Sequence, residues 1–162
     1  MRGPASFPGA GLFTFLILAG LSGCRGQSGD PSVLNADEAR ALGLSPGARL
    51  HQVTLGGRGS EEHAVPALIQ ADPGDAVEFR SVDHRVHTVT FPPDSLTPEV
   101  RAFLESTGQA NSPPLVFRGS RFIVKLENAP KGRYPFVSEG HGGTARGAVE
   151  VGLPLPPDTT ES

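Results

Sequence analysis

Two histidines in the sequence could be ligands of one metal ion. His87 begins "HTVTF", an alternating run typical of a strand, and His141 lies in the glycine-rich part of "YPFVSEGHGGTARGAVEV", between two strand-like segments. Neutral imidazoles are good ligands for Cu(II) and Zn(II). A carboxylate near either histidine, Glu139 or Asp83, could supply a third ligand. The spacing therefore indicates a candidate metal site built on two histidines.

Sulfur ligands are absent from this part of the chain. The only cysteine is Cys24 and the only methionine is Met1. The hydroxyl of Ser138, three residues before His141, does not ionise at neutral pH and is a poor metal ligand. A metal-free alternative stays open, in which Glu139 or Asp83 accepts hydrogen bonds from one or both imidazoles and Arg146 adds a charge pair.

Short strands must position these residues. Alternating or apolar runs bounded by proline and glycine turns occur at residues 49–55, 64–71, 76–83, 84–92, around Val116, and at 122–126, 134–137 and 146–152. Helical patterns occur at Asn35–Gly43, with a capping box of Asn35 and Glu38, and after Thr97. About eight short strands with one or two short helices predict an all-β sandwich or barrel. Ser60–His63 is expected to be an exposed loop. His51 is expected to be an ordinary strand residue.

Three segments together resemble the cupredoxin family of blue-copper proteins. They are "PGDAVEF", "HTVTF" from His87, and "YPFVSEGHGGTARG" from Tyr134. In the last of these the family has Tyr-x-Phe-x-Cys, a short loop to a second histidine, and then Met-x-Gly. This chain has Ser138 in place of the cysteine and Ala145 in place of the methionine. The resemblance covers residues from about 49 to 152.

This resemblance implies a Greek-key β-sandwich, copper binding and electron transfer, with His87 and His141 at one end of the domain. Because Ser138 and Ala145 replace the sulfur ligands, a blue type-1 centre is not expected, and at most a His-based Cu(II) site would remain. The second hypothesis is a metal-free interaction or assembly module in an envelope redox complex. No spacing of a Ser-His-Asp triad occurs, so an enzyme is not expected.

The N-terminus indicates export. The apolar run from Gly11 to Leu21 is too short to span a bilayer and has the pattern of a secretory signal. Its end, Leu21-Ser22-Gly23-Cys24, resembles the lipobox of bacterial lipoproteins, which implies cleavage before Cys24 and lipid on its sulfur. The sequence thus predicts a signal peptide at 1–23, a tether at 24–34, a cupredoxin-like domain at 35–154 and a disordered tail at 155–162.

This organisation predicts a membrane-anchored lipoprotein facing the periplasm or the cell exterior. Removal of residues 1–23 leaves 139 of the 162 residues and takes away one of the 14 basic residues, so the formal charge changes from −3 to −4. That charge does not favour nucleic acid as a partner. The expected partners are the membrane, through Cys24, and another envelope protein. The sequence leaves the oligomeric state open.

Overall fold

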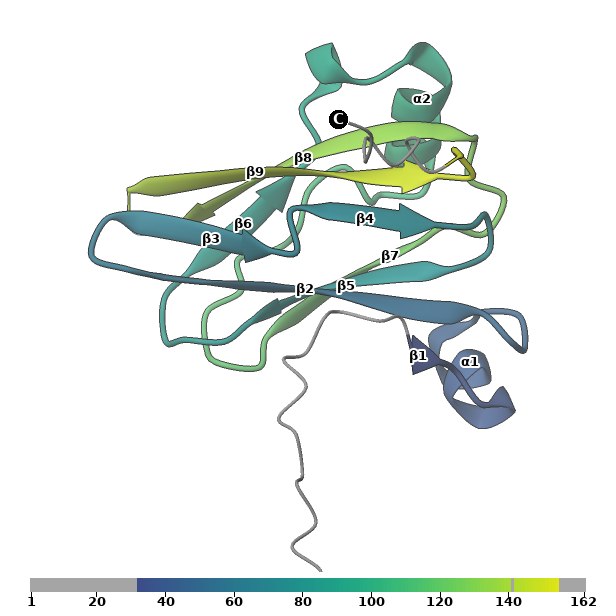
Figure 1. Cartoon of the computed structure of the whole chain (residues 1–162), viewed down its shortest axis with the longest axis horizontal. Coiled ribbons are helices and arrows are strands. Elements are labelled where there is room, and N and C mark those ends of the chain that lie inside the picture. The colour runs from purple at the N-terminus through teal and green to yellow at the C-terminus, as the bar shows by residue number, and fades with distance from the viewer. Residues whose placement is uncertain (1–31, 141, 155–162) are drawn as a thin grey trace, which may run out of the picture.

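The computed structural model describes residues 32–140 and 142–154, which form a two-layered β-sandwich with nine strands (Figure 1). The strands are β1 Ser32–Val33, β2 Arg49–Arg58, β3 Glu61–Val65, β4 Leu68–Ala71, β5 Ala76–Ser81, β6 His87–Thr90, β7 Arg121–Lys125, β8 Gly132–Gly140 and β9 Gly143–Val151. The helices are α1 Ala36–Leu42, α2 Pro98–Ser106 and the 3-10 turn η1 Pro93–Ser95. The predicted all-β sandwich with two short helices is confirmed.

Each layer is one sheet. The first has the strand order β1-β2-β5-β7, and β3 also pairs with β2, beyond the segment that pairs with β1. The second has the order β4-β9-β8-β6. Strands β2 and β5 run parallel, as do β4 and β9, whereas β8 is antiparallel to both β6 and β9. Figure 1 shows the two sheets stacked, with β2, β5 and β7 in one layer and β4, β8 and β9 in the other.

Aromatic side chains fill the space between the sheets. Phe79 of β5 contacts Phe136 of β8 edge to face, with ring centroids 4.9 Å apart, and Phe91 packs edge-on against both. All three rings are buried. Burial raises the pKa of Tyr134 to about 12, and its hydroxyl donates to the carbonyl of Pro130 at 2.7 Å. This core fixes β5, β6 and β8 relative to one another.

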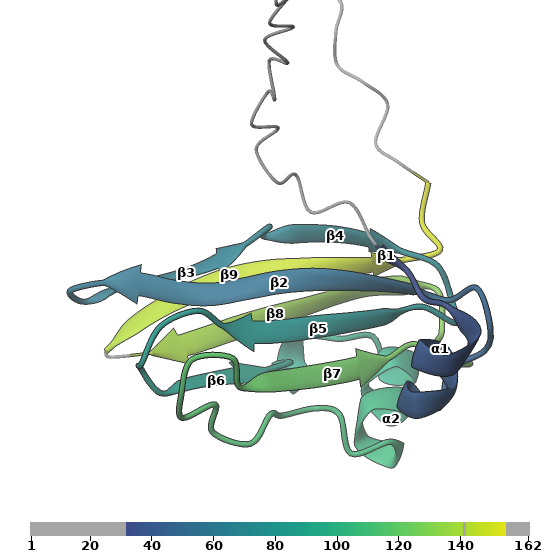
Figure 2. The same cartoon turned by 90° about the horizontal axis from the view of Figure 1, so that it is seen from below.

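The two helices begin as the sequence predicts. Asn35 accepts from the N–H groups of Asp37 and Glu38, and the Glu38 carboxylate accepts from the Asn35 N–H, which completes the capping box. Helix α1 packs on the outer face of the first sheet through a small apolar cluster (Figure 2). Helix α2 is capped by Thr97 and packs into the main core with Leu104. None of the helices within residues 32–140 and 142–154 is long and apolar enough to cross a membrane.

Three local expectations differ from the structure. The segment 64–71 is not one strand: Pro66 separates β3 from β4, which belong to different sheets. Val116 lies in a loop, because Pro113 and Pro114 before it lack the N–H that a ladder needs, and only neighbouring Leu115 forms an isolated bridge, with His87. Strand β1 pairs with β2 at Ser32–Val33, within residues assigned to the tether.

Candidate functional site

His87 is held at the start of β6, in the interior of the domain. Its N–H and carbonyl exchange hydrogen bonds with Leu115 at 3.1 and 2.8 Å, and it lies opposite Gly140 of β8. A Cβ atom at position 140 would lie 2.8 Å from Nδ1 of His87 and 2.5 Å from Oε2 of Glu62. Glycine at this position therefore leaves the room that the buried imidazole and the carboxylate occupy.

Both ring nitrogens of His87 face a carboxylate. Nδ1 lies 2.8 Å from Oε1 of Glu62, whose side chain is fully buried, and Nε2 lies 2.8 Å from Oδ1 of Asp83, whose side chain is one-quarter exposed. Ionised carboxylates only accept hydrogen bonds. Each ring nitrogen that carries a proton can therefore donate to the carboxylate that it faces.

Ser138 completes the buried cluster from β8. Its hydroxyl donates to Oε1 of Glu62 at 2.7 Å, so one carboxylate oxygen accepts from both His87 and Ser138. The side chain of Ser138 is fully buried. Oε2 of Glu62 is also buried and has no hydrogen-bond partner among the described residues. A single metal ion that contacted both His87 and Ser138 would therefore have to lie where Oε1 of Glu62 lies.

Asp83 is ionised at the edge of this cluster. Burial by itself would raise the pKa of its carboxyl, but the hydrogen bond from His87 and the N–H groups of Arg85 and Gly57, at 2.8 and 3.2 Å, outweigh that effect. The pKa of Asp83 therefore lies below its ordinary value of 3.8. His87 consequently lies between two acidic groups that come from different segments of the chain.

The other predicted site residues have different surroundings. Glu139 is exposed, because it points away from the buried face of β8 that carries Ser138. Ala145 is opposite Ser138 on β9 and packs at the margin of the core. Arg146 is exposed. His141 and Cys24 lie outside the described residues. Among the described residues, the structure therefore brings together His87, Asp83 and Ser138 but not Glu139.

Sequence reasoning missed Glu62. The expectation of an exposed loop at Ser60–His63 is wrong, because Glu61–Val65 forms β3, with Glu62 and Ala64 buried and the alternate side chains exposed. The available signal was the strand period of two, which places Glu62 on the same face as Ala64. A buried acid gives no hydrophobic pattern, so composition alone favours the loop.

Comparison with known proteins finds similarity to solved structures but none to family models or curated sequences. Neither a protein-family model nor a curated protein sequence matches the chain. A purple cupredoxin from Nitrosopumilus maritimus is 20% identical over 62% of this chain and 97% of its own, with a TM-score of 0.43. Oxidized plastocyanin from Dryopteris crassirhizoma is 22% identical over 62% of this chain and 98% of its own (TM-score 0.45). A copper-containing nitrite reductase from Thermus scotoductus is 20% identical over 78% of this chain and 26% of its own (TM-score 0.46).

The two stacked sheets agree with the β-sandwich that the resemblance to cupredoxins implies. The side chains around His87 do not fit a blue copper centre. Such a centre needs a thiolate and two free imidazole nitrogens, whereas Ser138 offers a hydroxyl and both nitrogens of His87 are hydrogen-bonded to carboxylates. Within residues 32–140 and 142–154, no group of three or more His, Cys, Asp or Glu side chains is arranged to hold a metal ion.

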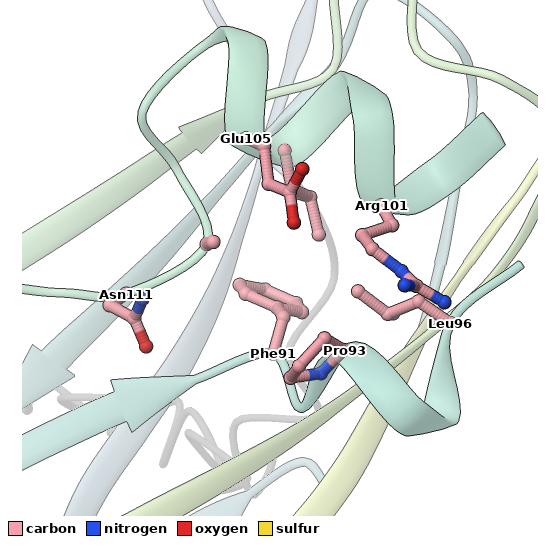
Figure 3. A pocket seen from close by; sticks show the side chains of 8 residues that line it. Phe91, Pro93, Leu96, Arg101, Glu105 and Asn111 are labelled. Atoms are coloured by element: carbon pink, nitrogen blue, oxygen red, sulfur yellow. The ribbon is translucent and has the colours of Figure 1, made fainter. Parts of the chain in front are cut away.

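A small cavity of about 160 Å³ lies elsewhere in the domain, between η1 and α2 (Figure 3). Its interior is formed by Phe91, Leu96 and Leu104, and Arg101 and Glu105 stand at its side. It shares no residue with the cluster of Glu62, His87, Asp83 and Ser138. The side chains that line the cavity include no serine, cysteine, threonine or lysine.

Proposed function

We propose that this chain is a lipid-anchored, cupredoxin-like module of the bacterial cell envelope. It acts by binding another envelope protein, and it does not transfer electrons through copper. Of the two hypotheses that the sequence raises, the metal-free module agrees better with the hydrogen bonds around His87. The position of Oε1 of Glu62, 2.8 Å from Nδ1 of His87 and 2.7 Å from Oγ of Ser138, carries this conclusion.

Metal binding at His87 would have to break hydrogen bonds that are already in place. A Cu(II) ion needs an unprotonated ring nitrogen. Freeing Nδ1 would break its 2.8 Å hydrogen bond with the buried Glu62 carboxylate, and a buried polar group left unpaired costs about 1–3 kcal/mol. Freeing Nε2 would instead remove a hydrogen bond that lowers the pKa of Asp83. Either route opposes copper binding at this histidine.

The envelope location is supported by the N-terminal pattern. The lipobox Leu21-Ser22-Gly23-Cys24 follows an apolar run, and two or three acyl chains at Cys24 would hold the protein firmly at a membrane. The variant Cys24→Ser should be released from membranes or keep its signal peptide. Membrane fractionation with intact-mass analysis tests this, and a variant that stays processed and membrane-bound would contradict it.

A Cu(II) titration of the mature protein tests the metal-free state. EPR and optical spectra should show no copper signal that depends on His87, so the parent and His87→Ala should titrate alike. In Glu62→Ala, Nδ1 loses its carboxylate and becomes available, so weak, pale, nitrogen-ligated copper should appear and should vanish when His87→Ala is added. Metal analysis of the parent as purified is the companion measurement.

A control variant and a contrary result define how the copper titration could refute the metal-free proposal. Glu61→Ala, one residue from Glu62 on the exposed face of β3, should behave like the parent. A parent that binds one Cu(II) with nitrogen ligation lost in His87→Ala would overturn the metal-free proposal and support the His-based copper site. That result would leave the membrane anchor untouched, because the anchor depends on Cys24 alone.

A further inference from the structure

Exposed apolar side chains gather on two loops of this domain. Among the described residues only eight large hydrophobic side chains are exposed, and four of them lie within residues 82–86 and 116–118. These are Val82, Val86, Val116 and Phe117, with exposed fractions of 41, 48, 51 and 62%. Exposed apolar side chains that gather in one region of a domain can mark a site of interaction. We call these four residues, with Arg85 and Arg118, the loop patch.

The two loops lie side by side because the backbone joins them at both ends. At one end, the carbonyl of Ser81 accepts from the N–H of Gly119, and the N–H of Ser81 donates to the carbonyl of Ser120. At the other end, His87 exchanges two backbone hydrogen bonds with Leu115. Residues 82–86 and 116–118 are therefore enclosed between the same two pairings. The two loops therefore present their apolar side chains from neighbouring stretches of backbone.

The charge of the loop patch is opposite to that of the chain. Arg118 is exposed and Arg85 is half-buried, and neither has an acidic partner within salt-bridge distance in the described part of the chain. Nη1 of Arg85 is itself buried and has no hydrogen-bond partner there. The only acid in the two loops, Asp83, is hydrogen-bonded to His87. The formal charge of the whole chain is −3. A partner that fits this patch would present apolar groups ringed by carboxylates.

The patch lies at the end of the domain opposite to β1. Its loops leave β5 and enter β7, whereas β1 pairs with the first residues of β2, beside the start of β5. Figures 1 and 2 both show β1 and α1 at one end and the β5–β6 connection at the other. The six residues of β5 span about 20 Å between these ends. The loop patch and strand β1 therefore lie at opposite ends of the first sheet.

We propose that the loop patch is the docking surface for a protein partner with an apolar, acid-ringed face. This inference names the partner chemistry of the interaction module proposed above and rests on that function. Phe117 is the anchor, since exposed aromatic side chains and arginines contribute most of the binding energy in protein interfaces. Arg85 and Arg118 supply charge complementarity, so binding weakens as salt rises. A membrane surface and a second copy of the chain are the competing occupants.

Photo-cross-linking in cells that naturally make the protein tests the surface. Benzoylphenylalanine replaces Phe117 in the full-length lipoprotein, and the matched control carries it at Val33, which is exposed at the opposite end. A discrete protein adduct should form from position 117 only. The double variant Arg85→Glu with Arg118→Glu should lose that adduct. An unchanged unfolding temperature shows that this variant remains folded.

Binding of the purified adduct partner decides the outcome. Its dissociation constant for the mature protein should rise at least about tenfold in the double variant and rise with salt. An adduct of twice the chain mass, or one that survives charge reversal, would overturn the proposal. Co-sedimentation of the Cys24→Ser protein with phosphatidylglycerol vesicles, lost in Phe117→Ala, would assign the patch to a membrane and equally overturn it.

The copper titration and the cross-linking experiment test separate claims. Copper binding by the parent would contradict the metal-free function while leaving the loop patch adduct in place. Conversely, the absence of an adduct at position 117, in a protein that also binds no copper at His87, would refute the docking surface alone.

Discussion

Replacement of Glu62 by alanine should destabilise the domain strongly, although the residue lies in a strand next to an exposed hairpin. The change removes the acceptor of two buried donors, Nδ1 of His87 and the Ser138 hydroxyl. Each donor left unpaired in the interior costs about 1–3 kcal/mol. Removal of the buried carboxylate, whose Oε2 has no partner among the described residues, recovers part of that cost. We therefore expect a net loss of about 3 kcal/mol.

The measurement is urea unfolding followed by far-ultraviolet circular dichroism, on the mature protein with Cys24→Ser in every sample. The matched control is Glu61→Ala, because Glu61 has the same chemistry one residue away but its side chain is 74% exposed. That control should change the free energy of unfolding by less than about 0.5 kcal/mol. If Glu62→Ala and Glu61→Ala lower the free energy of unfolding by amounts that differ by less than about 0.5 kcal/mol, the buried cluster does not stabilise the domain as inferred.

A double-mutant cycle with Ser138→Ala isolates the hydrogen bond. In the parent, Ser138→Ala removes one donor to Glu62 and should cost about 1 kcal/mol. In the Glu62→Ala background the hydroxyl is already unpaired, so its removal should be neutral or stabilising. The coupling energy should therefore be at least about 1 kcal/mol. Additive losses would mean that Glu62 and Ser138 do not interact, contrary to their 2.7 Å contact.

Three further outcomes follow from the packing and charges. Phe136→Ala should cost about 3–5 kcal/mol in the same unfolding assay, and a cost below about 1 kcal/mol would show that β8 is misplaced. Gly140→Ala should destabilise by about 1–3 kcal/mol, because its Cβ would lie 2.5 Å from Oε2 of Glu62; a neutral effect would refute that packing. Burial alone would raise the pKa of Asp75, but hydrogen bonds from His51 and two N–H groups lower it below 3.8. Its contribution is therefore present above pH 3.8 and lost as pH falls through the lower folded-state pKa, a loss that Asp75→Asn should abolish in acid unfolding curves.

The sequence predicts the strand that carries His87 and a strand over 134–137, because their alternating apolar residues form one continuous core. The structure extends the second of these, as β8, through Ser138 to Gly140. Phe136 and Ser138 share a face of β8, so both are buried. The sequence cannot predict Glu62, which is 25 residues from His87 and 76 from Ser138 and reaches them only when β3 closes over the end of the sandwich. Local periodicity places a side chain on a face of a strand. Local periodicity does not predict which buried side chain of another strand will lie next to that side chain.

Ser138 and Glu62 are best understood as a pair. A thiolate at position 138 would place a second negative charge next to the Glu62 carboxylate, whose oxygen lies 2.7 Å from the present hydroxyl. Like charges that close together disfavour ionisation, so a cysteine there would stay a thiol and would be a poor copper ligand. A neutral donor such as serine instead satisfies the carboxylate, which also lies 2.8 Å from Nδ1 of His87. Serine at position 138 and the acid at position 62 are thus parts of one buried, hydrogen-bonded arrangement that includes His87.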